Sequence, residues 1–366
     1  MFEPKYLITE NILTNIVKFE VVRSMIGSMG LIDEWELRLQ QDALVRRVSL
    51  FSRLLGGGLT DEVIGKIVLD DPERDEKVFE VAKRLSIVGK EREIQQVLNI
   101  VNTYRYVNHL VFLANKFKET GLGEKELCQI NTILGERIYK SDVLGVYRLR
   151  EAISDSFEFV PTIEVTFLLE DVLKWMVSQK MKSQNPLLGY GVLLYELVRI
   201  LPFEENSLVT VLEFVRSAMS AQGYDLKKLW YLEEQLLKNE SLFWLAAKSV
   251  EKNDGDMTEY LEFFTQSLAD GGDRLKVRLL NLIGELPKFR TESGKVVALS
   301  ERRIALMEEI TVRSEMTIKE LRSVLPMVSD DTILRDLKDL LLKKMIKKRG
   351  KTKGAVYVLG KIKSFK

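Results

Sequence analysis

The sequence predicts a mainly α-helical protein that ends in a small domain of three helices and two strands. Only seven of its 366 residues are proline, and apolar residues recur mostly at spacings of three and four, the period of a helix face. From residue 298 onward, three helical patterns precede a basic turn, KTKG, flanked by the short strand-like runs IKKRG and AVYVL. Three helices followed by a two-stranded wing are the elements of a winged helix-turn-helix, which places its third helix in the DNA major groove.

Capping residues and periodicity place the elements that precede this small domain. Thr9 and Thr60 are the side chains expected to cap two helices. Between 144 and 161 the helical stripe is lost and SFEFV alternates, so we expect a β-hairpin there. Helices resume at Thr162, and Gly271-Gly272 is expected to close the domain. The longest helical patterns before the hairpin cover 73–87, 90–119 and 123–140.

Composition limits the classes of protein to which the chain can belong. No apolar run approaches the ~18 residues that a membrane helix needs, and MFEPKYLITEN is not the start of a signal peptide. With Cys128 as the single cysteine, internal disulfides are excluded, and we expect a cytoplasmic protein. One cysteine and one histidine, His109, cannot supply a structural zinc site, so no metal is expected.

The net charge of +1 conceals an asymmetry along the chain. The last 24 residues, from Lys343, carry ten Lys and Arg and no acid, which leaves a balance of −9 for the rest. A basic end on an acidic body indicates that this end meets a polyanion.

Seven segments spread over nearly the whole chain match one family in the same order. They are MFEPKYLIT at the N-terminus, ALVRRVSLFSRLLGGGLT at 43–60, GVYR at 145–148, FVP at 159–161, LLYELVRILPF at 193–203, LWYLEEQLLKNESLFW at 229–244 and GDMTEYLEFF at 255–264. Together these segments resemble those of Fic-family proteins. The resemblance implies a Fic-type helical bundle with a small β-hairpin flap, followed by the C-terminal winged helix-turn-helix. Fic enzymes usually move AMP from ATP to a hydroxyl group of a target protein.

The loop at 201–212, LPFEENSLVTVL, departs from the family's catalytic loop at most functional positions. The family has a histidine where this chain has Leu201, and an alkyl group cannot accept the proton of the attacking hydroxyl. Phe203 keeps the position of the core anchor, and Glu205 keeps the acidic position that binds Mg²⁺ in the family. The family's phosphate-binding glycines and arginines are replaced by Asn206, Leu208, Val209 and Leu212.

A second degenerate position concerns the family's inhibitory helix, which offers a glutamate to the loop's second arginine. Leu55 stands at the glutamate position and Leu212 at the arginine position. An apolar pair can replace an ion pair without loss of stability. We therefore predict that Leu55 and Leu212 lie close together in one core.

Two surfaces remain as candidates for binding. In the family the flap takes a target peptide by strand addition, which Tyr147, Arg148 and the stretch around Phe157 could still do. On the winged helix, Asp330 and Asp331 open the recognition helix and would face the DNA backbone, which argues against binding. The candidate DNA contacts are Arg335 and Lys338 on that helix and Lys347, Lys348, Arg349, Lys351 and Lys353 on the wing.

Three hypotheses of function follow from these features. The first is a catalytically inactive regulator that binds DNA through 298–362, without cofactors. The second is an AMP- or other nucleotidyl-transferase that uses Glu205, ATP and Mg²⁺, and the third is a protein-interaction scaffold. A homodimer is also compatible with the resemblance. The expected domains are an N-terminal helical region at 1–115, a core at 116–272, a linker at 273–297 and the winged helix at 298–366.

Overall fold

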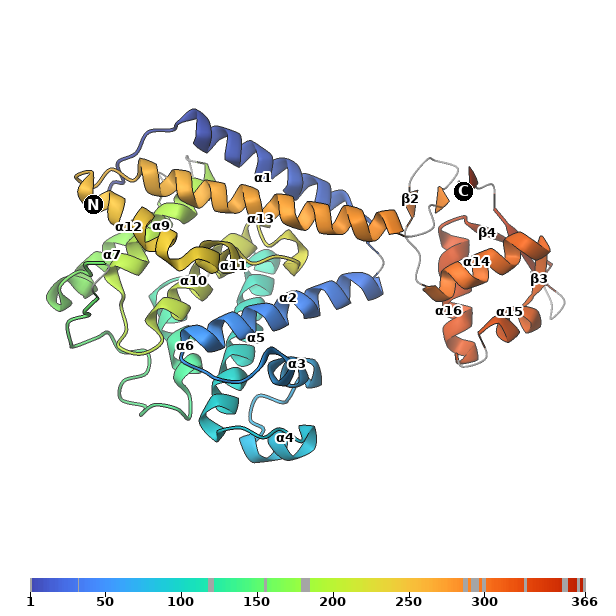
Figure 1. Cartoon of the computed structure of the whole chain (residues 1–366), viewed down its shortest axis with the longest axis horizontal. Coiled ribbons are helices and arrows are strands. Elements are labelled where there is room, and N and C mark those ends of the chain that lie inside the picture. The colour runs from blue at the N-terminus through green and yellow to red at the C-terminus, as the bar shows by residue number, and fades with distance from the viewer. Residues whose placement is uncertain are drawn as a thin grey trace. The chain divides into compact units, whose positions relative to one another are not determined.

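The computed structural model divides the chain into two units (Figure 1). Unit 1 comprises Met1–Gly27 and Leu39–Leu275, and unit 2 comprises Ser28–Arg38 and Lys276–Lys366. Unit 1 thus contains the 201–212 loop together with most of the two segments predicted as separate domains, 1–115 and 116–272. The described residues are 2–31, 33–117, 122–154, 157–178, 185–285, 289–290, 296–297, 301–325, 328–350, 355–360 and 363–364.

Unit 1 is built almost entirely from helices. Thr60 caps α3 by accepting a hydrogen bond from the amide of Val63, as the sequence predicts, and the hydroxyl of Thr9 accepts one from Ile12 in the first turn of α1. The last residue of α1, the start of α2 and the end of α13 belong to the residues of unit 2. The helices that lie wholly or mostly in unit 1 are α1 (Glu10–Ser28), α2 (Asp33–Leu54), α3 (Asp61–Asp70), α4 (Val78–Leu85), α5 (Glu91–Phe117), α6 (Glu124–Gly135), η1 (Thr162–Glu164), α7 (Val165–Met176), α9 (Pro186–Ile200), α10 (Ser207–Ala221), η2 (Leu226–Lys228), α11 (Leu232–Leu236), η3 (Leu237–Asn239), α12 (Glu240–Lys252) and α13 (Thr258–Glu285).

Helix α10 lies at the centre of unit 1. It packs against α5, α6 and α9, and nearly every residue from Ser207 to Ser220 is buried. A helix that is buried all round carries no hydrophilic face, which explains why its sequence, SLVTVLEFVRSAMSA, lacks a clean amphipathic stripe. The 201–212 loop therefore joins two helices, α9 and α10, that are both almost entirely buried.

Helix α13 differs from its prediction, because it continues through Gly271-Gly272, where we expected the domain to end. A Cβ atom at Gly271 would collide with the indole of Trp230 and come within 2.7 Å of Gln235 Cγ. Gly271 therefore permits close packing of α13 against its neighbours and does not terminate the helix.

Unit 2 contains a compact group of three helices and one antiparallel sheet. The strands run in the order β3-β5-β4, and the register pairs Tyr357 with Met316 on one side and with Lys348 on the other. Two-residue strands form a second sheet, β2-β1-β6. The elements are β1 (Phe289–Arg290), β2 (Val296–Val297), α14 (Glu301–Arg313), β3 (Glu315–Thr317), α15 (Ile318–Val324), α16 (Asp330–Leu342), β4 (Ile346–Arg349), β5 (Val356–Leu359) and β6 (Lys363–Ser364).

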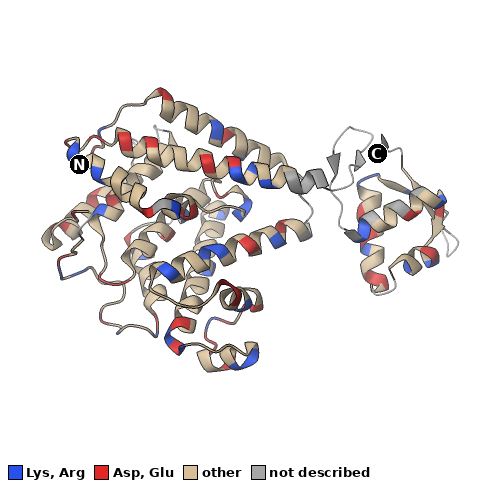
Figure 2. Cartoon of the chain, in the orientation of Figure 1, with Lys and Arg blue, Asp and Glu red and all other residues tan. Residues whose placement is uncertain are grey.

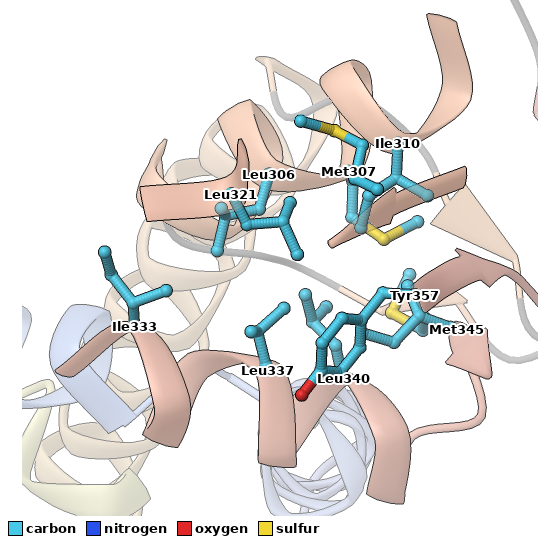
Figure 3. Close-up of a cluster of buried hydrophobic side chains, with 11 residues drawn as sticks. Leu306, Met307, Ile310, Leu321, Ile333, Leu337, Leu340, Met345 and Tyr357 are labelled. Atoms are coloured by element: carbon cyan, nitrogen blue, oxygen red, sulfur yellow. The ribbon is translucent and has the colours of Figure 1, made fainter. Parts of the chain in front are cut away.

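Unit 2 has its own hydrophobic core (Figure 3). Thr317 caps α15 in a capping box with Glu320, and the apolar faces of the three helices meet the sheet. Helix α16 contributes Ile333, Leu337 and Leu340, which follow helical spacing. The other buried members are Leu306, Met307, Ile310, Met316, Leu321, Met345, Ile346 and Tyr357.

Candidate functional site

The 201–212 loop has a tightly determined backbone. Helix α9 ends at Ile200, and the φ of its C-cap residue Leu201, 45°, is left-handed. Helix α10 begins after Asn206, whose φ is 58°. Asparagine tolerates this conformation, but for leucine it costs about 1–2 kcal/mol. Arg148 holds the Leu201 end of the loop, and Asn131 holds the loop near Glu205.

Arg148 is the first of these side chains, and it is a buried clamp on the backbone. Its Nε donates to the Leu201 carbonyl at 3.0 Å, and its Nη2 donates to the carbonyls of Ile200, at 3.3 Å, and Val160. Nη1 donates to the Thr162 hydroxyl at 2.9 Å. Arg148 is 3% exposed, so its guanidinium joins the end of α9 to the 160–162 segment and is not presented to a target protein.

Asn131, on α6, is the second side chain that holds the loop, and the sequence alone did not identify it. Its Nδ2 donates to the Glu205 carbonyl at 2.8 Å and to the Thr210 hydroxyl at 3.1 Å. Its Oδ1 accepts from the amide of Gly145 at 2.9 Å. One buried amide therefore fixes the loop, the first turns of α10 and the start of the flap segment.

The flap segment differs from the expected hairpin. Among its described residues, 144–154 and 157–161, no strand pairs with another strand of the same segment. Tyr147 instead forms an antiparallel bridge with Phe203, and the Val160 amide donates to the Arg199 carbonyl at 3.1 Å. Pairing with the buried 199–203 backbone satisfies the polar groups that a free hairpin would satisfy internally.

The flap positions named from the sequence thus have different surroundings. The Tyr147 ring lies 5.8 Å from that of Phe203, and its hydroxyl donates to Glu124. Burial and this hydrogen bond raise the pKa of Tyr147 above its usual range. Phe157 is buried in an aromatic cluster with Tyr195 and Trp244. Tyr147 and Phe157 both contribute to the packing of the flap on unit 1.

The replaced positions of the loop are mainly apolar and packed. Phe203, Val209 and Leu212 are buried, and Leu201 and Leu208 are partly buried. Leu212 also lines a small cavity of about 20 Å³, which is room for roughly one water. At the positions where the resemblance implies phosphate-gripping arginines, the structure therefore has buried hydrocarbon.

The charged residues of the loop face partners of their own. Glu204 pairs with Arg150 at 3.1 Å. Glu205 is partly buried, and it raises the pKa of Tyr139, for which burial is the larger cause. The Asn206 side chain makes no capping hydrogen bond to α10. In the described part of the chain, no group of three or more His, Cys, Asp and Glu is arranged to hold a metal ion.

Leu55 and Leu212 have different neighbours in the structure. That the two leucines lie close together stays a prediction. Leu55 follows the last residue of α2 and is half-buried, and its carbonyl accepts from Gln96 Nε2 on α5 at 2.8 Å. Leu212 is buried on α10, which packs on α5. Both leucines thus belong to elements that contact α5.

A buried ion network links α2 to α10 one residue beyond Leu212. Arg47 is fully buried, with Nη2 2.8 Å from Glu213 Oε1 and Nε bonded to Glu233. Arg216 Nε lies 3.1 Å from Glu213 Oε2. The Arg47 guanidinium also lies 4.7 Å from the centre of the Phe51 ring. The sequence signal for this network is weak, since an Arg pair in a helix, such as Arg46-Arg47, usually indicates a solvated face.

The candidate DNA-contact residues gather on exposed parts of unit 2. Arg335 and Lys338 are exposed on α16, opposite the face that packs into the core. Lys347, Lys348 and Arg349 are exposed on β4, with Lys348 Nζ 5.9 Å from the centre of the Tyr357 ring. Lys351 and Lys353 lie outside the described residues. His109 is exposed on α5.

The acidic residues of α16 are largely neutralised within unit 2. Asp336 is buried, and its two oxygens meet two arginines of α14. In the described residues, Arg335 and Lys338 have no such ionic partner. The pairs are Asp330 with Arg322 at 2.9 Å, Asp336 with Arg302 and Arg303 at 3.1 and 2.8 Å, and Asp339 with Arg303 and Lys343 at 3.0 and 2.6 Å.

Comparison with solved structures identifies the fold. A Fic family protein from Desulfovibrio desulfuricans G20 matches with a TM-score of 0.59 at 17% identity, covering 98% of this chain and 99% of that chain. A segment of Fic-1 from C. elegans matches with a TM-score of 0.52 at 12% identity, over 74% and 73% of the two chains. No protein-family model and no curated protein matches the chain. The protein has the Fic fold, as the resemblance implies.

The fold is mainly α, as expected, and the comparison extends over unit 2 as well as unit 1. Within the described residues, no helix is both long enough and apolar enough to cross a membrane.

Proposed function

We propose that this Fic-fold protein binds double-stranded DNA through unit 2 and does not transfer AMP. The observation that carries the proposal is the charge distribution on α16 and β4. Three of the four acids of α16, Asp330, Asp336 and Asp339, are paired with cations of unit 2. Arg335 and Lys338, together with Lys347 on β4, are exposed and lack ionic partners among the described residues. Unpaired exposed cations are what a phosphate backbone attracts.

The order of elements supports the same function. Helix α14, strand β3, helices α15 and α16, and strands β4 and β5 follow the order of a winged helix, with α16 in the place of the recognition helix. Of the two acids that argued against DNA binding in the sequence, Asp330 forms an ion pair with Arg322 and so presents less negative charge to DNA. Asp331 is exposed and forms no ion pair among the described residues, so it still opposes binding.

A salt-dependent titration of DNA tests this proposal. We expect affinity for a random-sequence duplex to fall linearly with the logarithm of salt concentration, with a slope of about −0.9 per phosphate contact. Arg335→Ala and Lys347→Ala should each reduce the slope by about one contact. Lys18→Ala, which removes an exposed cation of α1 in unit 1, is the matched control. Equal slopes for all three variants and the wild type would refute DNA binding through this surface.

The packing of the 201–212 loop supports the absence of AMP transfer. Leu201 offers no proton acceptor, and Leu212 and Val209 are buried where triphosphate oxygens would require positive charge. We expect no ATP binding that depends on Glu205, and no transfer of label from ATP to any protein in the presence of Mg²⁺. Micromolar ATP binding that is lost on Glu205→Ala, or labelled protein that depends on Glu205, would favour the alternative of a nucleotidyl-transferase.

A protein partner is the second candidate for unit 2, because α16 also exposes apolar side chains. Leu342 is 74% exposed and Leu334 is 41% exposed. Apolar contacts depend little on salt, whereas phosphate contacts depend strongly on it. Binding of a protein partner would be favoured if the affinity falls on Leu342→Ser but does not change between about 50 and 200 mM salt, the range in which DNA binding changes strongly.

A further inference from the structure

A polar groove lies along the outer face of α2 in unit 1. It has a volume of about 690 Å³, within the range of small-molecule sites. Arg46, Ser49 and Arg53 of α2 follow helical spacing and line one wall. The other lining residues come from α3, from the α11–η3 region and from α13, so three further parts of unit 1 converge on this helix face.

Cations exceed acids in the lining of the groove. Arg46, Arg53, Lys238 and Arg274 face it together with only two carboxylates, those of Asp61 and Glu234. Blue Lys and Arg segments on α2 are visible in Figure 2. The groove therefore carries an excess of positive charge and favours an anionic occupant.

The carboxylates occupy only part of the donor capacity of these cations. Arg46 Nε bonds Glu234 at 3.0 Å, and Arg53 Nη1 bonds Asp61 at 3.1 Å. A guanidinium has five N–H donors, so each arginine keeps donors for a ligand. Arg274 donates to the neutral amide of Gln235, and Lys238 has no carboxylate partner among the described residues.

Ser49 is a donor without a partner in the wall of the groove. The residue is 1% exposed, and its hydroxyl forms no hydrogen bond with the described protein atoms. A buried hydroxyl that lacks a partner loses free energy unless a ligand or water satisfies it. A phosphate oxygen fits this position, since it accepts from a hydroxyl and from arginine in the same site.

We propose that this groove binds a small molecule that carries a phosphate group. The cations hold the phosphate oxygens, Ser49 donates to one of them, and the length of the groove accommodates the rest of the molecule. Because Arg47 on the inner face of α2 belongs to the buried network with α10, an occupied groove stabilises the packing of α2 on unit 1. This site is separate from DNA binding by unit 2.

Calorimetry with inorganic pyrophosphate tests the proposal on the full-length protein at constant ionic strength. We expect saturable binding with one site in unit 1, and about tenfold weaker binding for Lys238→Gln and for Arg274→Gln, since each loses a charge-assisted hydrogen bond. Ser49→Ala should weaken binding about threefold without changing the melting temperature of the free protein by more than a few degrees.

Lys347→Gln is the matched control, because unit 2 also carries exposed cations that attract phosphate. It should bind pyrophosphate like the wild type, and Lys238→Gln should bind DNA like the wild type. The proposal is overturned if pyrophosphate does not bind, or if Lys347→Gln loses binding while Lys238→Gln and Arg274→Gln retain it. The DNA titration stands or fails independently of either result.

Discussion

Replacing Arg47 by methionine should be one of the most destabilising single changes in unit 1. The guanidinium is fully buried between Glu213 and Glu233, whose side chains are 0% and 2% exposed. Removing one partner of a buried pair leaves an uncompensated buried charge, which costs about 3–5 kcal/mol. Arg216 still pairs with Glu213, but no other described cation pairs with Glu233. We therefore expect a loss of about 3–5 kcal/mol in the free energy of unfolding.

Arg46→Met is the control, since Arg46 is the neighbouring residue and its ion pair with Glu234 is half exposed, at 43% for the arginine side chain. Such pairs contribute about 0–1 kcal/mol. Urea unfolding followed by tryptophan fluorescence reports mainly on unit 1, which contains three of the four tryptophans, Trp175, Trp230 and Trp244. If Arg47→Met lost no more stability than Arg46→Met, the network would not stabilise α2 against α10.

The pH dependence of the free energy of unfolding, compared between Arg47→Met and the wild type, gives a second test. Burial by itself raises the pKa of Glu213, but attraction to Arg47 and Arg216 outweighs it, so the pKa lies below its ordinary value. The stability that this pairing contributes is fully present above the unfolded pKa of about 4.3. It is lost as pH falls through the lower folded pKa. In Arg47→Met the Glu213 pKa should rise, so acidification should narrow the difference in the free energy of unfolding between this variant and the wild type. A difference in the free energy of unfolding that widened on acidification would contradict the pairing of Glu213 with Arg47.

Three further changes probe the loop, the flap and unit 2. Arg148→Met leaves the Leu201 and Val160 carbonyls without their donor, so it should cost about 2–4 kcal/mol and speed limited proteolysis within 145–161; unchanged proteolysis would show that the flap does not depend on this clamp. Gly145→Ala places a Cβ at φ 69° and 2.6 Å from Thr132 Oγ1, so we expect about 1–3 kcal/mol of destabilisation in urea, and a neutral result would contradict this geometry. Leu337→Ala should cost about 2–5 kcal/mol, seen as faster hydrogen exchange of α16, and equal exchange rates would mean that unit 2 does not depend on this core.

The sequence predicted most helices because they are amphipathic or capped locally. Thr60 caps its helix as expected, since a cap depends only on neighbouring residues. The sequence did not predict the close packing at Gly271, nor that the 144–161 segment pairs with the 199–203 backbone. A glycine pair looks the same whether it ends a helix or admits a tryptophan, and an extended segment looks the same whether it pairs with itself or with a distant loop.

The amino-acid sequence alone determined that the 201–212 loop lacks a histidine, the phosphate-binding glycines and both arginines, because the chemistry of each position is a property of its side chain. It also determined the helical class and the basic C-terminal end. Only the tertiary structure decided that Arg148 and Asn131 hold the loop and that Arg47 lies in a buried ion network. It also decided that Asp330, Asp336 and Asp339 of α16 are paired with cations of unit 2. These facts depend on residues that are far apart along the chain, and only the packing of helices brings their charges and hydrogen-bonding groups within reach.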